Sequence, residues 1–347
     1  MNKTRSFLLL ALLLGALLAA CSFSGASSSS SIPAADDDDD NDDNNDDDDD
    51  DNSPTADVFA VGDPGVLHYD GTSWTEMASS ASPLLGVWGT SPSDVFAVGY
   101  RTILHYDGVS WTTTEGPPRL FGVWGDSPSD VFAVGAGIAM PPDYYGIIFH
   151  YDGTSWAAMA LPSGAGALAG VWGASLSDVF AVGDEILHYD GTSWTIMNAP
   201  DGAAAVWGSS PSDVFAGGCG IMQHYDGTSW TTMASDTDAC LSGVWGASPS
   251  DVFAVGETAK YTGTVLHYDG TSWTTMASTP ELLIGVWGAS PSDVFAVGVI
   301  QDGNASGPEI AHYDGTFWTE MTSPNYHLYA VWGTSPADAA SAASSAY

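Results

Sequence analysis

One segment returns seven times along this chain, at spacings of 35 to 48 residues, and any fold must accommodate that period. Each copy contains V-W-G, D-V-F-A, H-Y-D-G and a second Trp, in that order along the chain. D-V-F-A starts at Asp57, Asp94, Asp130, Asp178, Asp213, Asp251 and Asp293, and H-Y-D-G starts at His68, His105, His150, His188, His224, His267 and His312. A unit of this length builds one small sheet and cannot form a domain by itself, so the chain is expected to be a repeat array.

Each unit contains four short apolar or alternating runs separated by turn residues, and none has a helical period. This pattern predicts a four-stranded antiparallel sheet. The D-V-F-A-V-G run is apolar at consecutive positions, as from Val95 to Val98, so both of its faces must be buried. Sheets that stack face to face around an axis provide this burial. We therefore predict an all-β, seven-bladed β-propeller over residues 57–338.

We call the four predicted strands A (V-W-G), B (D-V-F-A-V-G), C (I-L-H-Y) and D (S-W-T). S-P-S-D joins A to B and Asp-Gly joins C to D, and both turns are nearly constant, apart from Leu176 and Phe317. The B–C and D–A connections vary in length and composition. An antiparallel meander places the two constant turns at one end of each sheet, so the propeller should have a constant face and a variable face.

Strand A is expected to line the axis, because small residues surround its single Trp, and the more polar strand D should be outermost. The chain enters with strand B at Asp57 and leaves with strand A at Val331–Gly333. The C-terminal strand is therefore predicted to complete the first sheet, which closes the ring and leaves no open edge. Residues 339–347, rich in Ala and Ser, are expected to form a disordered tail.

The N-terminus is typical of an exported protein. Lys3 and Arg5 precede an apolar run, Phe7–Ala20, that is too short to span a bilayer but suits a signal peptide over residues 1–20. The run ends in L-A-A-C, which resembles the bacterial lipobox and implies lipidation of Cys21. The Ser that follows Cys21 implies sorting to the outer membrane, with the protein exposed at the surface or facing the periplasm.

Residues 21–56 are predicted to be a disordered, acidic tether. They include a Ser-rich stretch and then Asp36–Asp51, which contains thirteen Asp and three Asn. Loose cation condensation is expected there, while a specific calcium site stays open as an alternative. The net charge of the whole chain is −38, which makes nucleic acid and anionic lipid surfaces poor partners.

The repeat V-W-G-x-S-P-x-D-V-F-A-V-G followed by L-x-H-Y-D-G-x-x-W resembles kelch-like or sialidase-like propeller repeats, particularly those of envelope and secreted proteins of myxobacteria. The resemblance covers about Asp57 to Asp338. It implies the propeller architecture and leaves the activity open, because propellers host enzymes, lectins and scaffolds alike.

The seven repeated His residues invite a metal-site interpretation. One His per blade places them on separate sheets that do not converge, so each is expected to bond within its own blade to a turn Asp or a carbonyl. We expect no metal and no cofactor. An enzyme remains the alternative: a carbohydrate-active hydrolase or lyase would need two converging carboxylates, for which the candidates are Asp143, Asp184, Glu185 and Glu257.

Cys219 and Cys240 lie in connections of the variable face, and an exported protein meets an oxidising compartment. A disulfide between them is predicted, with two unrelated thiols as the alternative.

The variable face is the expected working surface, since its loops are free of the repeat. The richest of these loops is expected from Gly137 to Gly146, and His327 is expected in another, Pro324–Tyr329. Tyr side chains offer large contact area there at little entropic cost. We predict a monomeric, lipid-anchored binding module for a protein or glycan. Its candidate binding residues are Arg101, Arg119, Asp143, Tyr144, Tyr145, Lys260, Tyr261, Tyr326, His327 and Tyr329.

Overall fold

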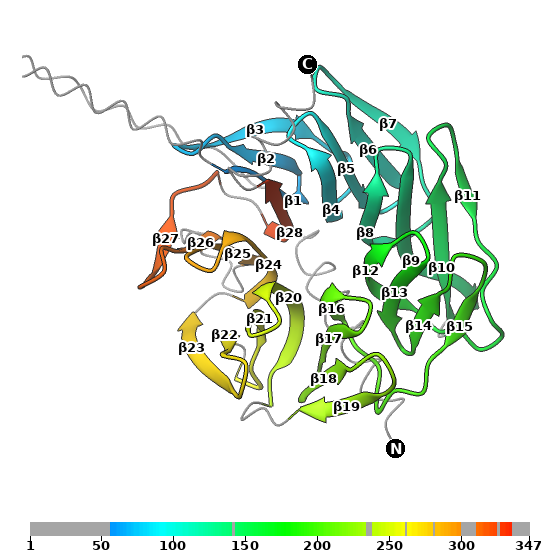
Figure 1. Cartoon of the computed structure of the whole chain (residues 1–347). Helices are drawn as coiled ribbons and strands as arrows, with labels where there is room; N and C mark the ends of the chain where they lie inside the picture. Colours follow the sequence, from blue (N-terminus) through cyan, green and yellow to red (C-terminus); the bar gives the residue numbers. More distant parts are fainter. Residues whose placement is uncertain are drawn as a thin grey trace, which may run out of the picture.

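The computed structural model describes residues 56–140, 143–233, 238–260, 262–279, 282–299, 310–324 and 327–334. Every helix or strand among these residues is a β-strand, and the strands form seven four-stranded sheets around a central axis (Figure 1). The predicted seven-bladed propeller is confirmed. The predicted signal peptide, nearly all of the tether and the tail lie outside the described residues. Within the described residues, no helix could cross a membrane.

The first four blades are built as follows. Blade 1 contains β28 (His327–Thr334), β1 (Asp57–Asp63), β2 (Gly65–Tyr69) and β3 (Trp74–Ser79). Blade 2 contains β4 (Leu84–Ser91), β5 (Asp94–Gly99), β6 (Thr102–Tyr106) and β7 (Trp111–Glu115). Blade 3 contains β8 (Leu120–Ser127), β9 (Asp130–Met140), β10 (Asp143–Tyr151) and β11 (Trp156–Ala158). Blade 4 contains β12 (Leu168–Ser175), β13 (Asp178–Gly183), β14 (Ile186–Tyr189) and β15 (Trp194–Ile196).

The last three blades follow the same order. Blade 5 contains β16 (Ala205–Ser210), β17 (Asp213–Gly218), β18 (Ile221–Tyr225) and β19 (Trp230–Met233). Blade 6 contains β20 (Cys240–Ser248), β21 (Asp251–Glu257), β22 (Gly263–Tyr268) and β23 (Trp273–Thr279). Blade 7 contains β24 (Leu282–Ser290), β25 (Asp293–Val299), β26 (Ile310–Tyr313) and β27 (Trp318–Met321).

The ring closes as predicted. Strand β28 pairs antiparallel with β1, from Asp57 opposite Thr334 to Asp63 opposite His327. Blade 1 therefore takes its innermost strand from the C-terminal end of the chain and its other three strands from the beginning. Asp57 and Thr334 both lie at the end of the sheet that carries the S-P-S-D turns in the other blades, so both chain ends reach the propeller at the constant face.

The V-W-G strands are the innermost strands of their sheets (Figure 1), and an indole lies on a glycine between neighbouring blades. A Cβ added to Gly125 would lie 2.6 Å from the ring of Trp88, and one added to Gly246 would lie 2.6 Å from the ring of Trp207. The Gly of one blade thus leaves room for the Trp of the blade before it. This contact explains why both residues recur together.

The D-V-F-A strands fill the space between blades. Val95, Phe96, Ala97 and Val98 are all buried, which confirms that strand B is enclosed on both faces. Aromatic rings carry the contact from one blade to the next: the Phe180 ring lies edge-on to that of Trp230 in blade 5, with centroids 6.2 Å apart. Burial of these rings provides much of the hydrophobic stabilisation between blades.

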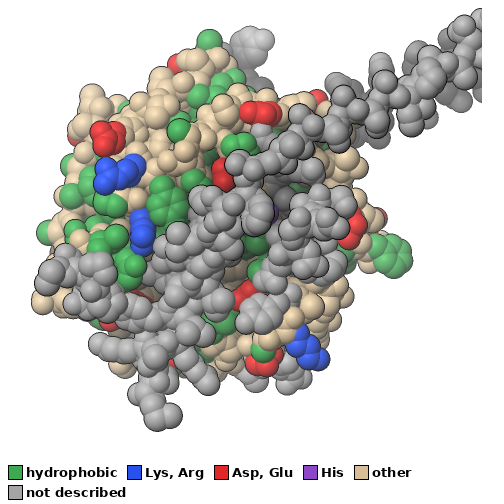
Figure 2. All heavy atoms as spheres, turned by 180° about the vertical axis from the view of Figure 1, so that it is seen from behind, with side chains coloured by type: hydrophobic (Ala, Val, Ile, Leu, Met, Phe, Trp, Pro, Cys, Tyr) green, Lys and Arg blue, Asp and Glu red, His purple; other side chains and the backbone are tan. Residues whose placement is uncertain are grey.

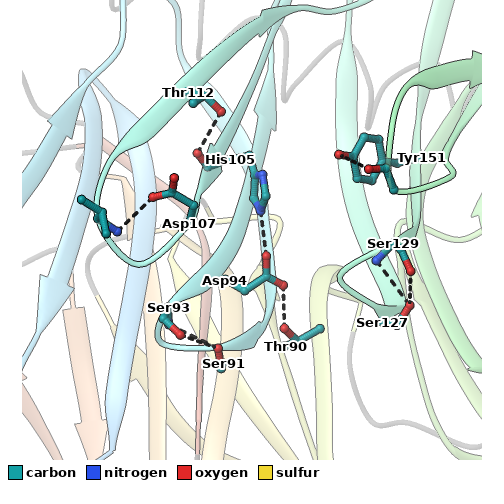
Figure 3. A network of polar contacts seen from close by, with 12 residues as sticks. Thr90, Ser91, Ser93, Asp94, His105, Asp107, Thr112, Ser127, Ser129 and Tyr151 are labelled. Atoms are coloured by element: carbon teal, nitrogen blue, oxygen red, sulfur yellow. Dashed lines mark hydrogen bonds and ion pairs between the residues drawn. The ribbon is translucent and has the colours of Figure 1, made fainter.

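The constant face is held by local polar contacts (Figure 3). His105 Nε2 lies 2.7 Å from Asp94 Oδ1, and the Thr90 hydroxyl donates to Asp94 Oδ2 at 2.5 Å. All seven repeat His residues make this bond within their own blade, as predicted. In the H-Y-D-G turns the Asp accepts backbone N–H groups. Bonds from Ser155 and Thr154 lower the pKa of Asp152 to about 2.

The Asp-Gly connection is a four-residue hairpin loop. In blade 1, Tyr69 pairs with Trp74 across it, and Gly71 has a φ of 91°, in the left-handed region that favours glycine. A hairpin was predicted at this dipeptide, and the Asp side chain caps it by accepting from the two residues after the Gly.

Cys219 and Cys240 are bonded in the structure, with an S–S distance of 2.04 Å. Cys219 follows β17 of blade 5 and Cys240 begins β20 of blade 6, so the bond ties two neighbouring blades at the variable face. It closes a loop with a sequence separation of 21 residues, which is worth about 3 kcal/mol in the chain-entropy model.

Reduction of the purified protein, or Cys219→Ser, is therefore expected to lower the free energy of unfolding by about 3 kcal/mol in a urea titration. Mass spectrometry before and after reduction and alkylation counts the thiols. Two alkylated thiols without prior reduction would contradict the bond.

Candidate binding surface on the variable face

The longest ordered feature of the variable face is the β9–β10 hairpin. The sequence predicted an irregular loop from Gly137 to Gly146, and that prediction is wrong in its local structure. Strand β9 continues to Met140 and β10 begins at Asp143, with Tyr145 paired to Gly137. The segment adds three residue pairs to the antiparallel sheet, because the residues after D-V-F-A-V-G continue to pair across the strands.

A cationic side chain lies between two aromatic rings at this face. The Arg119 guanidinium carbon is 5.9 Å from the centroid of Tyr100 and 5.5 Å from that of Tyr144. These distances are those of cation–π contacts. Tyr100 follows β5, Arg119 precedes β8, and Tyr144 lies on β10, so neighbouring blades supply the group. We call Tyr100, Arg119 and Tyr144 the Arg119 cluster.

The Arg119 cluster is partly exposed. All three residues are half-buried, and Nη1 of Arg119 is buried with no hydrogen-bond acceptor among the described residues. Tyr145, next to Tyr144, is 48% exposed. Ile138 on β9 is also exposed and pairs with Tyr144, so it lies on the same face of the hairpin as that ring, whereas Tyr145 pairs with Gly137 and lies on the opposite face.

Two further basic residues lie on the same face. Arg101 is exposed between β5 and β6, with a φ of 54°, and its carbonyl accepts from the backbone N–H of Gly116. Lys260 is exposed between β21 and β22. Figure 2, seen from the side opposite to Figure 1, shows Lys and Arg side chains next to hydrophobic ones, with Asp and Glu side chains spread around them.

The other candidate binding residues do not form one site with the Arg119 cluster among the described residues. Tyr329 lies on β28 and is 7% exposed, packed in a cluster with Leu282 and Val299, so the prediction that it contributes binding surface is wrong. His327 is half-buried as the first residue of β28, whereas the sequence placed it in a loop. Tyr261, Tyr326 and the side chain of Asp143 lie outside the described residues.

Two of the carboxylates proposed for an enzyme accept hydrogen bonds from the backbone and so have a structural role. Asp184 Oδ2 accepts the backbone N–H of Ala167 at 3.0 Å, and Glu185 Oε2 accepts that of Gly166 at 2.8 Å. Glu257 belongs to β21, two blades away, and partial burial raises its pKa. In the part of the chain that the structure describes, no group of three or more His, Cys, Asp or Glu could hold a metal ion.

Sequence reasoning missed Tyr100, the third member of the Arg119 cluster. A usable signal was present, because Tyr100 directly follows D-V-F-A-V-G in blade 2 and thus begins a B–C connection. The sequence does not show that these residues meet. Tyr100, Arg119 and Tyr144 lie in three different segments of the chain, and the stacking of blades 2 and 3 brings them together.

The comparisons with known proteins identify a fold. No protein-family model matches the chain, and no curated protein matches it. The WD40 β-propeller domain of Doa1 is similar at a TM-score of 0.57 and 9% identity, over 78% of this chain and 89% of that one. A chain of the mitotic checkpoint complex has a TM-score of 0.57 and 13% identity, over 87% and 100%.

A third solved structure, YCF48 from Cyanidioschyzon merolae, has a TM-score of 0.50 and 14% identity, over 69% of this chain and 85% of that one. At these identities the likeness shows the β-propeller fold alone.

Proposed function

We propose that this chain is a binding module, held at the outer membrane through lipid on Cys21, that captures a protein partner on its variable face. The observation that carries the proposal is the Arg119 cluster, a cation in contact with two aromatic rings, one of which pairs with the exposed Ile138. Arg and Tyr are the side chains that most often dominate binding energy in protein interfaces. One of the similar propellers comes from a multiprotein complex, which supports this choice.

The charge distribution favours a defined contact. The chain carries a net charge of −38, so Arg119 is one of few cations in an acidic molecule. An acidic group of the partner would be repelled by most of the surface and attracted to Arg119. This difference would fix the orientation of the bound partner and make binding specific. The Tyr rings on either side keep the guanidinium in place before binding, so little side-chain entropy is lost on association.

Arg119→Ala is expected to weaken partner binding about thirtyfold, which corresponds to the loss of a residue worth about 2 kcal/mol. Partners are captured by cross-linking from envelope extracts, identified, and titrated against the purified protein by calorimetry. Val109→Ala is the matched control, because Val109 is 87% exposed on the constant face and should leave affinity unchanged. Equal affinity of Arg119→Ala and the wild type would overturn the proposal.

A glycan ligand is the second candidate, because exposed Tyr rings also stack on sugars. A glycan array on the same protein separates the two: saturable binding to a sugar that Tyr145→Ala abolishes would replace the protein partner by a glycan. Hydrolysis of an arrayed sugar would instead favour the carbohydrate-active enzyme, with Glu257 as the first position to change.

The lipid anchor has its own test. Cys21→Ser is expected to move the protein from the membrane fraction to the soluble fraction, because lipoproteins are held by their acyl chains. Fractionation followed by immunoblotting measures this, and protease treatment of intact cells reports whether the propeller faces outward or toward the periplasm. Unchanged membrane association of the Ser variant would refute the anchor.

A further inference from the structure

A methionine covers the strand-D Trp at most junctions between blades. Trp194 Nε1 donates to the sulfur of Met159 in the preceding blade at 3.4 Å, and Trp230 Nε1 donates to the sulfur of Met197 at 3.3 Å. The Met lies three residues after the Trp of its own outermost strand, in S-W-A-A-M of blade 3 and in S-W-T-I-M of blade 4. Three other pairs share a hydrophobic cluster without this bond, since their indole N–H groups have no acceptor among the described residues: Trp74 with Met321, Trp111 with Met77, and Trp273 with Met233.

The remaining two junctions lack this methionine in that place. At Trp318 the cluster of described residues contains Ala277 of the preceding blade and no methionine, and Met276 is exposed. At Trp156 the repeat itself differs, because the residue three positions after Trp111 is Thr114. Thr114 pairs with Ile103 just as Met321 pairs with Ile310, so it occupies the methionine position.

A cleft of about 610 Å³ lies at this junction between blades 2 and 3. Phe96 and Ile103 line it from blade 2, Trp156 and Tyr151 line it from blade 3, and Thr114 contributes to its wall. Strand β7 carries short, polar Thr side chains, whereas the equivalent strands of the other blades have a methionine at the position of Thr114. The cleft is the space that the missing methionine leaves, widened toward the rim of the disc.

His105 also differs from its six counterparts at this junction. Its ring stacks flat on Phe96, with centroids 4.0 Å apart and an interplanar angle of 8°. In the other blades the corresponding rings are 4.6 to 4.8 Å apart and tilted by 37° to 47°. The His105 side chain, 30% exposed, is the most open of the seven. Figure 3 shows it in blade 2, with Tyr151 on the neighbouring blade.

We propose that this cleft binds the methionine side chain of a partner polypeptide, which takes the place that the protein's own methionines take at the equivalent junctions. The thioether would accept a hydrogen bond from Trp156 Nε1 and pack against Phe96, as Met159 does with Trp194. The volume exceeds that of one side chain and so has room for the flanking backbone. The site is separate from the Arg119 cluster and does not rest on the function proposed for it.

The rim of the cleft indicates the sequence around that methionine. Thr112, Thr114 and Ser155 offer hydroxyl groups that can bond peptide N–H and C=O groups. Glu115 is an exposed carboxylate at the same rim, and the molecule around it is strongly acidic. A methionine flanked by basic residues is therefore the segment that fits best.

The probe is the peptide acetyl-Lys-Met-Lys-amide, titrated into the purified full chain and followed by the indole N–H signals in ¹⁵N-labelled protein. The Trp156 signal, assigned by its loss in Trp156→Phe, is expected to shift saturably. Acetyl-Lys-Ala-Lys-amide keeps the charge and is expected to bind at least about tenfold more weakly. Equal binding of the two peptides, or binding of a methyl glycoside in place of both, would overturn the proposal.

Thr114→Met supplies the missing side chain from within the chain. This variant is expected to melt ~2–4 °C higher and to lose at least tenfold in affinity for the Met peptide, since the cleft is filled. The matched variant Met159→Thr opens the same position beside Trp194 and is expected to add a second shifting indole signal. Unchanged affinity of Thr114→Met for the Met peptide would also refute the proposal.

Discussion

A chain that ends at Thr322 is expected to lose the cooperative thermal unfolding of the propeller. The truncation removes β28, which pairs with β1 from Asp57 to Asp63. It also removes the inner Gly–Trp contacts on both sides of blade 1, because Gly333 receives the Trp287 ring and Gly89 receives the Trp332 ring. An open ring then exposes one strand edge and the apolar inner face of the first sheet.

Circular dichroism melting and size-exclusion chromatography measure the outcome. The control is a chain that ends at Thr334, which keeps β28 and is expected to keep the wild-type transition. A sharp melting transition within about 5 °C of the wild type after truncation at Thr322 would show that closure by β28 is dispensable.

Phe180→Ala is expected to produce the second large effect, a loss of ~3–5 kcal/mol in the free energy of unfolding. Phe180 is 1% exposed and packs between blades, with its ring centroid 5.8 Å from that of Tyr225 and 6.2 Å from that of Trp230. Removing the ring leaves a cavity between two sheets that cannot move together without disturbing the closed ring. Urea unfolding monitored by tryptophan fluorescence measures the loss.

Phe317→Ala is the matched control, since Phe317 is 69% exposed in the last Asp-Gly turn. It is expected to change the unfolding free energy by less than about 0.5 kcal/mol. A similar loss in both variants would mean that packing between blades does not dominate stability.

The architecture could be predicted because seven copies of the repeat carry the same strand and turn pattern. The consecutive apolar residues of D-V-F-A demand burial on both faces, and the phase of the first and last units demands closure by Val331–Gly333. Structure bears out both inferences, as well as the bond of each repeat His to its own blade. The structure differs from the prediction where the sequence leaves the repeat. After Val134 and Gly135, strand β9 continues to Met140, so the change in composition there did not mark a loop.

The binding surfaces were harder to predict because they depend on contacts between units. The sequence alone suggested an exposed position for Tyr329, yet this residue lies on the inner strand β28 and is buried beside Leu282. The cleft at Trp156 has one signal in the sequence, which is Thr114 at the position where most units have Met. That substitution can be interpreted only from the structure, in which the methionine of one blade covers the Trp of the next.

The place where the chain enters the ring also decides how the molecule responds to a mechanical pull. Strand β1 begins at Asp57 on the constant face and lies between β28 and β2, not at an edge. A force on the chain before Asp57, directed away from the disc, acts along β1 and perpendicular to its hydrogen bonds. The bonds to both neighbours then share the load in shear and cannot open one after another, so the first strand resists extraction while the variable face stays turned away from the pull.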